Sequence, residues 1–191
     1  MSKSQPWPLP RVASILALDL ATLTGFSMIS RAPGNLYHPS DVVSGTWTLA
    51  TAKELTKMRK TARHFDPRPG ALFAKIVGAL SGPGAEAEEV PTLIVWEDVE
   101  FVFSGAQITL WAGLRGALWS ASELLGRRGV GINHLSVPVG TLKKFATGHG
   151  GANKNAMARA AVAAGLVDAD HDLDDNGIDA RWLLEYALRT Y

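Results

Sequence analysis

The chain has 191 residues, 47% of them hydrophobic, which favours one globular domain with a sizeable core. Its net charge of +1 argues neither for nor against nucleic acid as a partner. Cysteine is absent, so disulfides and thiolate zinc sites are excluded, as is typical of a reducing cytoplasm. The first ten residues lack the apolar core of a signal peptide, and no apolar stretch reaches the length of a membrane span. We therefore expect a cytoplasmic protein without a membrane segment, with a tail over residues 1–11 and one domain over 12–191.

Three strands in close succession are predicted for the N-terminal part of the chain. A buried strand is expected over 12–18, a weaker one over 25–30, and a third, rich in β-branched and aromatic residues, over 42–49. Gly34 and Asn35 favour a turn before the third strand. Such short connections indicate an antiparallel meander.

The segment over 52–80 has helical composition but contains an Asp-Pro-Arg-Pro-Gly run at residues 66–70. The two prolines should break it, which predicts a basic helix, a gap, and a second helix over 71–80. A loop rich in Gly, Pro and Glu follows over 81–91. The remaining predicted elements are a strand over 92–96, a helix over 107–125, a strand over 129–137, and helices over 139–145, 152–164 and 176–189.

This order of elements predicts the fold class. Each strand–helix–strand unit implies a right-handed parallel crossover. A three-strand antiparallel meander followed by two parallel strands makes a mixed five-stranded sheet with helices on both faces. We therefore expect an α/β protein of ribonuclease H-like architecture, although several other α/β folds share a similar element count.

Charged residues are segregated along the chain. One segment is crowded with bases, a second basic group lies further on, and acids gather near the C-terminus. A protein that holds phosphates with bases and metal ions with acids has such a pattern, and solvated helix faces would also explain it. The three groups are Lys53, Lys57, Arg59, Lys60, Arg63 and Arg68; Lys143, Lys144, Lys154 and Arg159; and Asp168, Asp170, Asp172, Asp174, Asp175 and Asp179.

Four acids stand where predicted core elements end or begin: Asp19, Glu97, Asp175 and Asp179. A carboxylate at the end of a buried strand is poorly solvated and needs a partner. Several carboxylates brought together would repel one another unless a cation lay among them. Mg²⁺ or Mn²⁺ suits them, since these hard cations prefer oxygen ligands. The pattern indicates metal-assisted phosphodiester chemistry on nucleic acid.

The first two acids each have a local alternative. Asp19 closes an apolar run, and Thr24 and Gly25 in the turn that follows suit an approaching phosphate, although a polar β-turn would contain the same residues. Glu97 emerges at the end of its strand, where ligand sites of open α/β sheets gather, while Asp98 is interpreted as a loop charge.

A glycine-rich segment over 137–154 carries three lysines, Lys143, Lys144 and Lys154. Glycines let backbone N–H groups approach phosphates, and lysines supply charge. The spacing of a Walker A loop is missing, and a flexible loop between two helices is the alternative.

The last acidic motif is Asp174-Asp175-Asn176-Gly177-Ile178-Asp179. On a helix, residues four apart share a face, so Asp175 and Asp179 could ligate one metal ion together. Alternatively, Asp174 or Asp175 is an N-cap and Asp179 favours the helix dipole.

Several of these segments together resemble the RuvC-like Holliday-junction resolvases in order and spacing, and look closest to the bacteriophage branch of that family. The resemblance runs from about residue 12 to the C-terminus. Its combination of motifs is far more specific than any single part. The segments are ILALDLATLTGFSM, LIVWEDVEF, ITLWAGLRGAL, VPVGTLKKFATGHGGANKNAM and DDNGIDARWLLEYA.

The resemblance implies a metal site of four carboxylates: one after the first strand, one after the fourth and two on the last helix, which together bind two Mg²⁺ or Mn²⁺ ions. It matches Lys154 to a lysine that handles the scissile phosphate, and Lys143 and Lys144 to basic residues of the same segment. The four implied ligands are Asp19, Glu97, Asp175 and Asp179.

Two departures from the family pattern matter. Relatives from phages commonly carry an acid at the position of Gly177, and Ala-Asp-Lys at that of Ala152-Asn153-Lys154. Glycine costs about 1 kcal/mol against alanine inside a helix. If it delays the start of the last helix, Asp174 becomes the rival of Asp175 as a ligand.

The activity implied by the resemblance is that of a homodimeric endonuclease that cuts branched DNA and leaves 5′-phosphate and 3′-hydroxyl ends, in phage DNA processing within a bacterial cytoplasm. Phe101 and Phe103 could stack on unpaired bases at a junction, although core packing or a dimer contact explains them as well. A less selective nuclease for flaps, forks or RNA–DNA hybrids, and a non-catalytic DNA-structure binder, are the alternatives.

Overall fold

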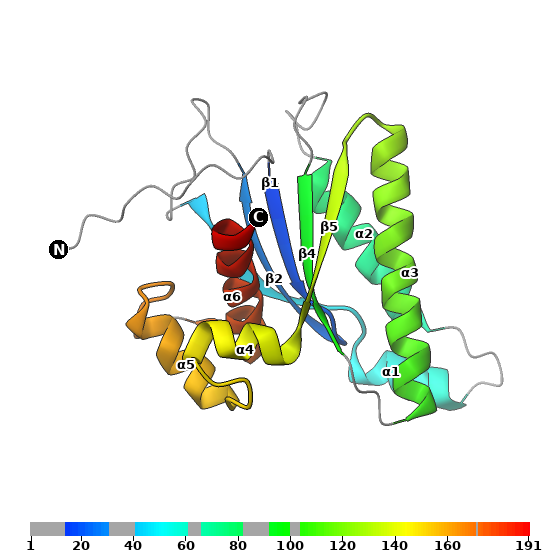
Figure 1. The fold of residues 1–191 in the computed structure, drawn as a ribbon. Helices are drawn as coiled ribbons and strands as arrows, with labels where there is room; N and C mark the ends of the chain where they lie inside the picture. Colours follow the sequence, from blue (N-terminus) through cyan, green and yellow to red (C-terminus); the bar gives the residue numbers. More distant parts are fainter. Residues whose placement is uncertain (1–13, 31–40, 61–65, 82–91, 100–103, 171) are drawn as a thin grey trace.

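The structure, a computed structural model, describes residues 14–30, 41–60, 66–81, 92–99, 104–170 and 172–191 (Figure 1). The expected tail over 1–11 lies outside these residues. The described strands form one five-stranded sheet in the order β3-β2-β1-β4-β5. Their bounds are β1 (Ser14–Asp19), β2 (Leu23–Ser30), β3 (Val43–Thr48), β4 (Thr92–Asp98) and β5 (Ile132–Pro138).

The sheet is mixed, as the sequence predicted. β2 runs antiparallel to both β1 and β3, which makes the expected meander. β4 lies parallel to β1 and to β5. The carboxyl ends of β1, β4 and β5 therefore meet at one edge of the sheet, the lower edge in Figure 1. We call this the carboxyl edge.

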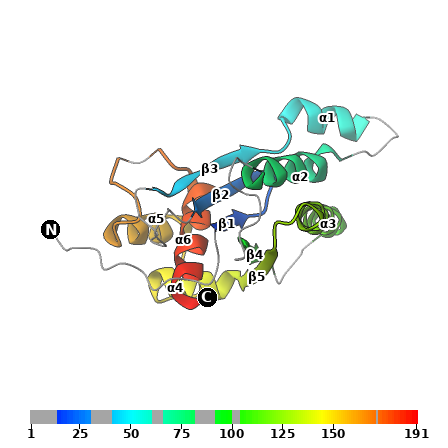
Figure 2. The ribbon, with the colours of Figure 1, turned by 90° about the horizontal axis from the view of Figure 1, so that it is seen from above.

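Helices cover both faces of the sheet (Figures 1 and 2). On one face, α2 (Pro67–Leu80) and α3 (Gly105–Arg127) pack over Leu16, Leu18 and Ile94. The other face is covered by α4 (Val139–Thr147), α5 (Lys154–Ala163) and α6 (Asp175–Thr190). None of the helices in the described ranges is long and apolar enough to cross a membrane.

The two prolines lie in the first turn of α2 rather than in the break before it, contrary to expectation. The helix begins at Pro67, and Asp66 is its N-cap, with its side chain accepting a hydrogen bond from the Arg68 N–H. Proline is tolerated in the first turn of a helix, where its missing N–H would have had no helical partner. The predicted break between two helices is confirmed at Asp66, which lies outside both, and α2 starts four residues earlier than predicted.

Strand alternation decides which side chains reach which face. Ile15 and Ala17 of β1, with Leu93 and Val95 of β4, belong to the core under α6, while the residues between them face α2 and α3. Side chains alternate along a strand, so residues two apart point to the same face. Asp19 comes two residues after Ala17, and Glu97 two residues after Val95, so both acids point to the face of α6.

Candidate active site

Asp19 and Glu97 lie side by side at the carboxyl edge. Leu18 of β1 is paired with Trp96 of β4, so the acids that follow come at the same level of two adjacent parallel strands. Their carboxyl groups interact through charge and a shared hydrogen bond. Burial, and then the charge of Glu97, raises the pKa of Asp19 well above its usual value.

Asp179 brings a third carboxyl group to this pair from the second turn of α6. Burial, and then the charge of Asp179, raises the pKa of Glu97 to about 7. Burial also raises the pKa of Asp179 to about 6, and nearby Asp175 adds to that rise. The structure thus brings Asp19, Glu97 and Asp179 together, with Asp175 one helical turn from Asp179.

Lysines face these acids from α4 and α5. The charges of Lys154 and Lys143 lower the pKa of Asp179, and Lys143 also lowers that of Glu97. The Lys154 Nζ lies 3.2 Å from an Asp175 carboxylate oxygen, and this hydrogen bond is the main cause of the raised pKa of Lys154. Lys144 is exposed on α4 and forms no ion pair within the described residues.

The start of α6 separates Asp174 from Asp175. Asp174 is the N-cap: its carboxylate accepts hydrogen bonds from the Gly177 N–H at 2.9 Å and from the Thr46 hydroxyl of β3 at 2.5 Å. Asp175 is the first helical residue and faces Lys154. Gly177 therefore does not delay the helix, and Asp174 has a structural partner of its own.

The departure at Asn153 also has a local explanation. Asn153 is the N-cap of α5, and its side-chain oxygen accepts a hydrogen bond from the Ala156 N–H at 2.9 Å. Asparagine is as good an N-cap as aspartate. Lys154 thus begins the helix at the acidic cluster without a carboxylate directly before it.

Gly25 is a residue whose main role the sequence does not reveal. It lies opposite Asp19 in the β1–β2 pair. A Cβ atom on Gly25 would stand only 1.9 Å from the backbone oxygen of Asn176 in α6. The bare glycine lets the first turn of α6 lie against β2, which carries Asp175 and Asp179 over the carboxyl edge.

Thr24 does not fit its predicted contact with DNA. Its side chain is fully buried, and its hydroxyl donates a hydrogen bond of 2.6 Å to the carbonyl of Ala21. The residue shapes the β1–β2 turn and is closed to an incoming phosphate. Phe101 and Phe103, the two predicted base-stacking residues, lie outside the described residues.

The side chain of Asp98 points to the opposite face of the sheet from that of Glu97, as strand alternation requires. It forms an ion pair with Arg115 of α3, on the opposite face of the sheet. The Arg115 guanidinium also lies 4.9 Å from the ring centre of Trp96. Asp98 therefore fastens the end of β4 to α3, and Glu97 alone points toward Asp19.

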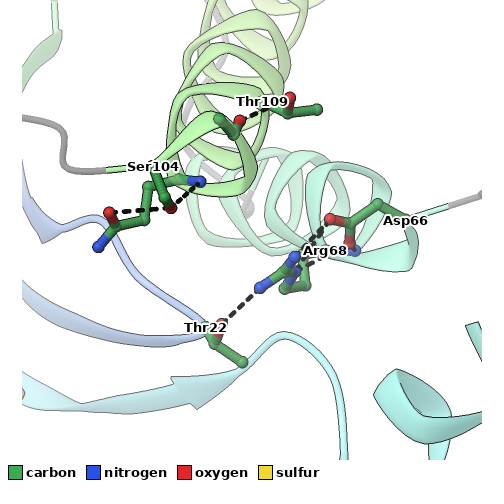
Figure 3. A network of polar contacts seen from close by, with 7 residues as sticks. Thr22, Asp66, Arg68, Ser104 and Thr109 are labelled. Atoms are coloured by element: carbon green, nitrogen blue, oxygen red, sulfur yellow. Dashed lines mark hydrogen bonds and ion pairs between the residues drawn. The ribbon is translucent and has the colours of Figure 1, made fainter. Parts of the chain in front are cut away.

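A polar network fastens the turn that follows Asp19 to α2 (Figure 3). The Arg68 guanidinium donates to the Thr22 hydroxyl at 2.9 Å and pairs with Asp66 at 2.6 Å. Figure 3 also draws Ser104, the N-cap of α3, and Thr109 of the same helix. The carboxyl edge is thus held to the helices on the face away from the acids.

Two solved structures have the same architecture. Thermus thermophilus RuvC superposes with a TM-score of 0.58 and 16% identity, covering 92% of this chain and 91% of that one. T. thermophilus RuvC in complex with Holliday junction substrate gives a TM-score of 0.56 and 18% identity, with the same coverage. The chain has the RuvC fold. No family model and no curated protein matches the sequence.

The comparison confirms the ribonuclease H-like fold predicted from the sequence. At this identity it establishes the RuvC fold, and the function has to be argued from the site that the fold assembles. The bacteriophage branch, the homodimer and the four-carboxylate metal site remain predictions.

On this RuvC fold, the acidic cluster has the donor chemistry for a divalent cation. All of its donors are carboxylate oxygens, which Mg²⁺ and Mn²⁺ prefer, and a cation among them would offset the repulsion that raises their pKa values. As they stand, no three acidic or histidine side chains of the described residues enclose a common point closely enough for an ion. Binding would therefore require Asp19 and Glu97 to open their shared hydrogen bond.

The raised pKa values predict that the ion-free protein loses stability as the pH rises. Acidic side chains titrate at about 4 in an unfolded chain, whereas Asp179 and Glu97 titrate at about 6 and about 7 in the folded protein. Between these values the folded state binds more protons, so the free energy of unfolding falls with increasing pH. We expect the melting temperature in a chelating buffer to fall from about pH 5 to about pH 8.

The control for this prediction is Asp19→Asn, which removes one repelling charge without changing the size of the side chain. Its melting temperature should exceed that of the wild type at the higher pH and match it at the lower. Mn²⁺ should raise the melting temperature of the wild type at the higher pH, because a ligand that binds the folded state stabilises it, and should do little for the variant. A wild-type melting temperature insensitive to both pH and Mn²⁺ would contradict the arrangement.

Proposed function

We propose that the protein is a metal-dependent endonuclease that cuts branched DNA. The observation that carries the proposal is the meeting of Asp19, Glu97 and Asp179 at the carboxyl edge, with Lys143 and Lys154 facing them. Mutually repelling carboxylates beside lysines destabilise the folded protein, and they suit the binding of a metal ion and a phosphate. The complex of Thermus RuvC with a Holliday junction supports branched DNA as the substrate.

Four carboxylates would hold the ions in this proposal: Asp19, Glu97, Asp175 and Asp179. When bound, two Mg²⁺ or Mn²⁺ ions supply an activated water and stabilise the leaving oxygen of a phosphodiester. Asp175 belongs to this set because it is turned toward Lys154, whereas Asp174 is occupied with Thr46 and Gly177. Hydrolysis would leave 5′-phosphate and 3′-hydroxyl ends.

The lysines handle the phosphate. Lys154 stands at the start of α5 with its side chain two-thirds exposed, so it can turn from Asp175 to a phosphate oxygen and neutralise the charge that develops there. Lys143 is half-buried, and its side chain lies near Glu97 and Asp179. Lys144, exposed beside it, would contact the DNA backbone outside the cluster.

A two-fold junction requires two cuts on strands of the same polarity relative to the branch, which a homodimer with two identical sites provides. We therefore include a homodimer in the proposal. The motifs shared with the bacteriophage branch favour junction resolution or debranching of phage DNA as its setting.

The test is a comparison of four substrates with Mg²⁺ or Mn²⁺: a four-way junction, a flap, a linear duplex and an RNA–DNA hybrid. We expect the junction to be cut fastest. Equal cutting of the linear duplex would refute junction selectivity and favour a less selective nuclease of the same fold. Tight binding of the junction without nicking by either ion would refute catalysis and leave a DNA-structure binder.

A further inference from the structure

A basic helix stands beside the carboxyl edge and takes no part in the site described above. This helix is α1 (Ala52–Lys60), which directly follows β3. Its first turn is closed by reciprocal bonds: the Thr51 N–H donates to the Glu54 carboxylate at 2.8 Å, and the Glu54 N–H donates to the Thr51 hydroxyl at 3.2 Å. Glu54 is therefore held by hydrogen bonds at the start of the helix, and the lysines make the rest of α1 positively charged.

The segment between β3 and α1 is tied to the turn that follows Asp19. The Leu49 N–H donates a hydrogen bond of 2.9 Å to the carbonyl of Thr22, three residues beyond Asp19. Figure 1 shows α1 at the same end of the molecule as the first turn of α3, and both views place it across the sheet from α4 and α5 (Figures 1 and 2). The carboxyl edge thus lies between two sets of lysines.

Three lysines share one face of α1. Lys53, Lys57 and Lys60 follow the four-and-three spacing of a helix face, and all three are exposed. With Ala52 and Thr56 they line an open hollow on the surface. Within the described residues none of the three makes an ion pair, in contrast to Arg68 of α2, which is committed to Asp66 and Thr22.

The last two of these lysines lie in the final turn of α1, where cations favour the helix dipole. Three like charges on one helix face also repel one another, and an anion opposite them would relieve that repulsion. We propose that the face formed by Lys53, Lys57 and Lys60 binds the phosphate backbone of a duplex arm as it leaves the branch point. This inference rests on the proposed function and extends it: α4 and α5 handle the strand that is cut, and α1 holds DNA on the other side of the carboxyl edge.

Phosphate contacts of this kind add affinity without reading sequence, and they are sensitive to salt. Each contact contributes about 0.9 to the slope of log affinity against log salt concentration for duplex DNA. The triple variant Lys53→Gln, Lys57→Gln, Lys60→Gln should therefore bind a four-way junction with a slope shallower by about 2 to 3, and about tenfold or more weakly in moderate salt. Glutamine keeps the helix propensity and the length of the side chain.

Binding is measured in a chelating buffer, so that the junction is not cut, with a labelled junction at several salt concentrations. The matched control removes three exposed cations away from the carboxyl edge: Lys75→Gln, Arg127→Gln, Arg128→Gln. It should keep the wild-type slope. Equal melting temperatures of wild type and α1 variant verify that the fold is intact.

A slope that is unchanged in the α1 variant, or reduced equally in the control, overturns the inference while leaving the proposed function standing. A wild-type protein that binds no branched DNA overturns both.

Discussion

Replacing Asp19 with asparagine should abolish cleavage of branched DNA and leave its binding nearly unchanged. Asp19 is the most deeply placed member of the acidic cluster, in contact with Glu97 and close to Asp179 and Lys154. Asparagine keeps the shape but removes the negative charge that a divalent cation needs. We expect the cleavage rate to fall by about a thousandfold or more, as when a group that acts in the transition state is removed. Affinity should change little, because phosphate contacts carry most of it.

The neighbouring acids at the start of α6 supply the controls. Asp174→Asn should keep near wild-type cleavage, since asparagine is as good an N-cap as aspartate and the cap is the role that the structure gives Asp174. Asp175→Asn should lose cleavage like Asp19→Asn. Single-turnover cleavage and junction affinity are measured for all three variants. Undiminished cutting by Asp19→Asn would refute the site, and loss of cutting in Asp174→Asn but not in Asp175→Asn would exchange the roles of the last two acids.

Replacing Gly25 with alanine should disable the site without touching any of its acids. The added Cβ would lie 1.9 Å from the Asn176 backbone oxygen, a distance that no real contact allows. Either α6 moves away from β2 or the first turn of α6 unwinds, and both shifts carry Asp175 and Asp179 away from Asp19. We expect cleavage to fall as far as in Asp19→Asn, with a loss of stability of about 1–3 kcal/mol from overpacking.

The matched control is Gly78→Ala in α2, where nothing lies within 4 Å of the added Cβ. It should raise the stability by about 1 kcal/mol, because alanine is the better helix former, and leave cleavage unchanged. Urea unfolding and single-turnover cleavage distinguish the two glycines. Wild-type cleavage and stability in Gly25→Ala would show that α6 does not need the close approach to β2.

The sequence by itself determined the sheet and two of its acids. Apolar runs ending in Asp19 and Glu97 predict strands whose last side chains emerge at the sheet edge, and parallel pairing brings those ends together. Alternation along β4 also separates Glu97 from Asp98 before any contact is known. These features rest on local pattern and on a few rules of strand connection, so they can be derived without coordinates.

Only the tertiary structure decided how the last helix joins that edge. Asp174 becomes the cap because Thr46 of a distant strand donates to it, and Gly25 matters because the backbone of α6 lies against β2. Thr24 is fully buried in the folded protein, although the sequence predicted a turn open to phosphate. Each of these outcomes depends on a contact that local propensity does not encode. The position of Asp175 and Asp179 over Asp19 is therefore a property of the packed molecule rather than of any segment.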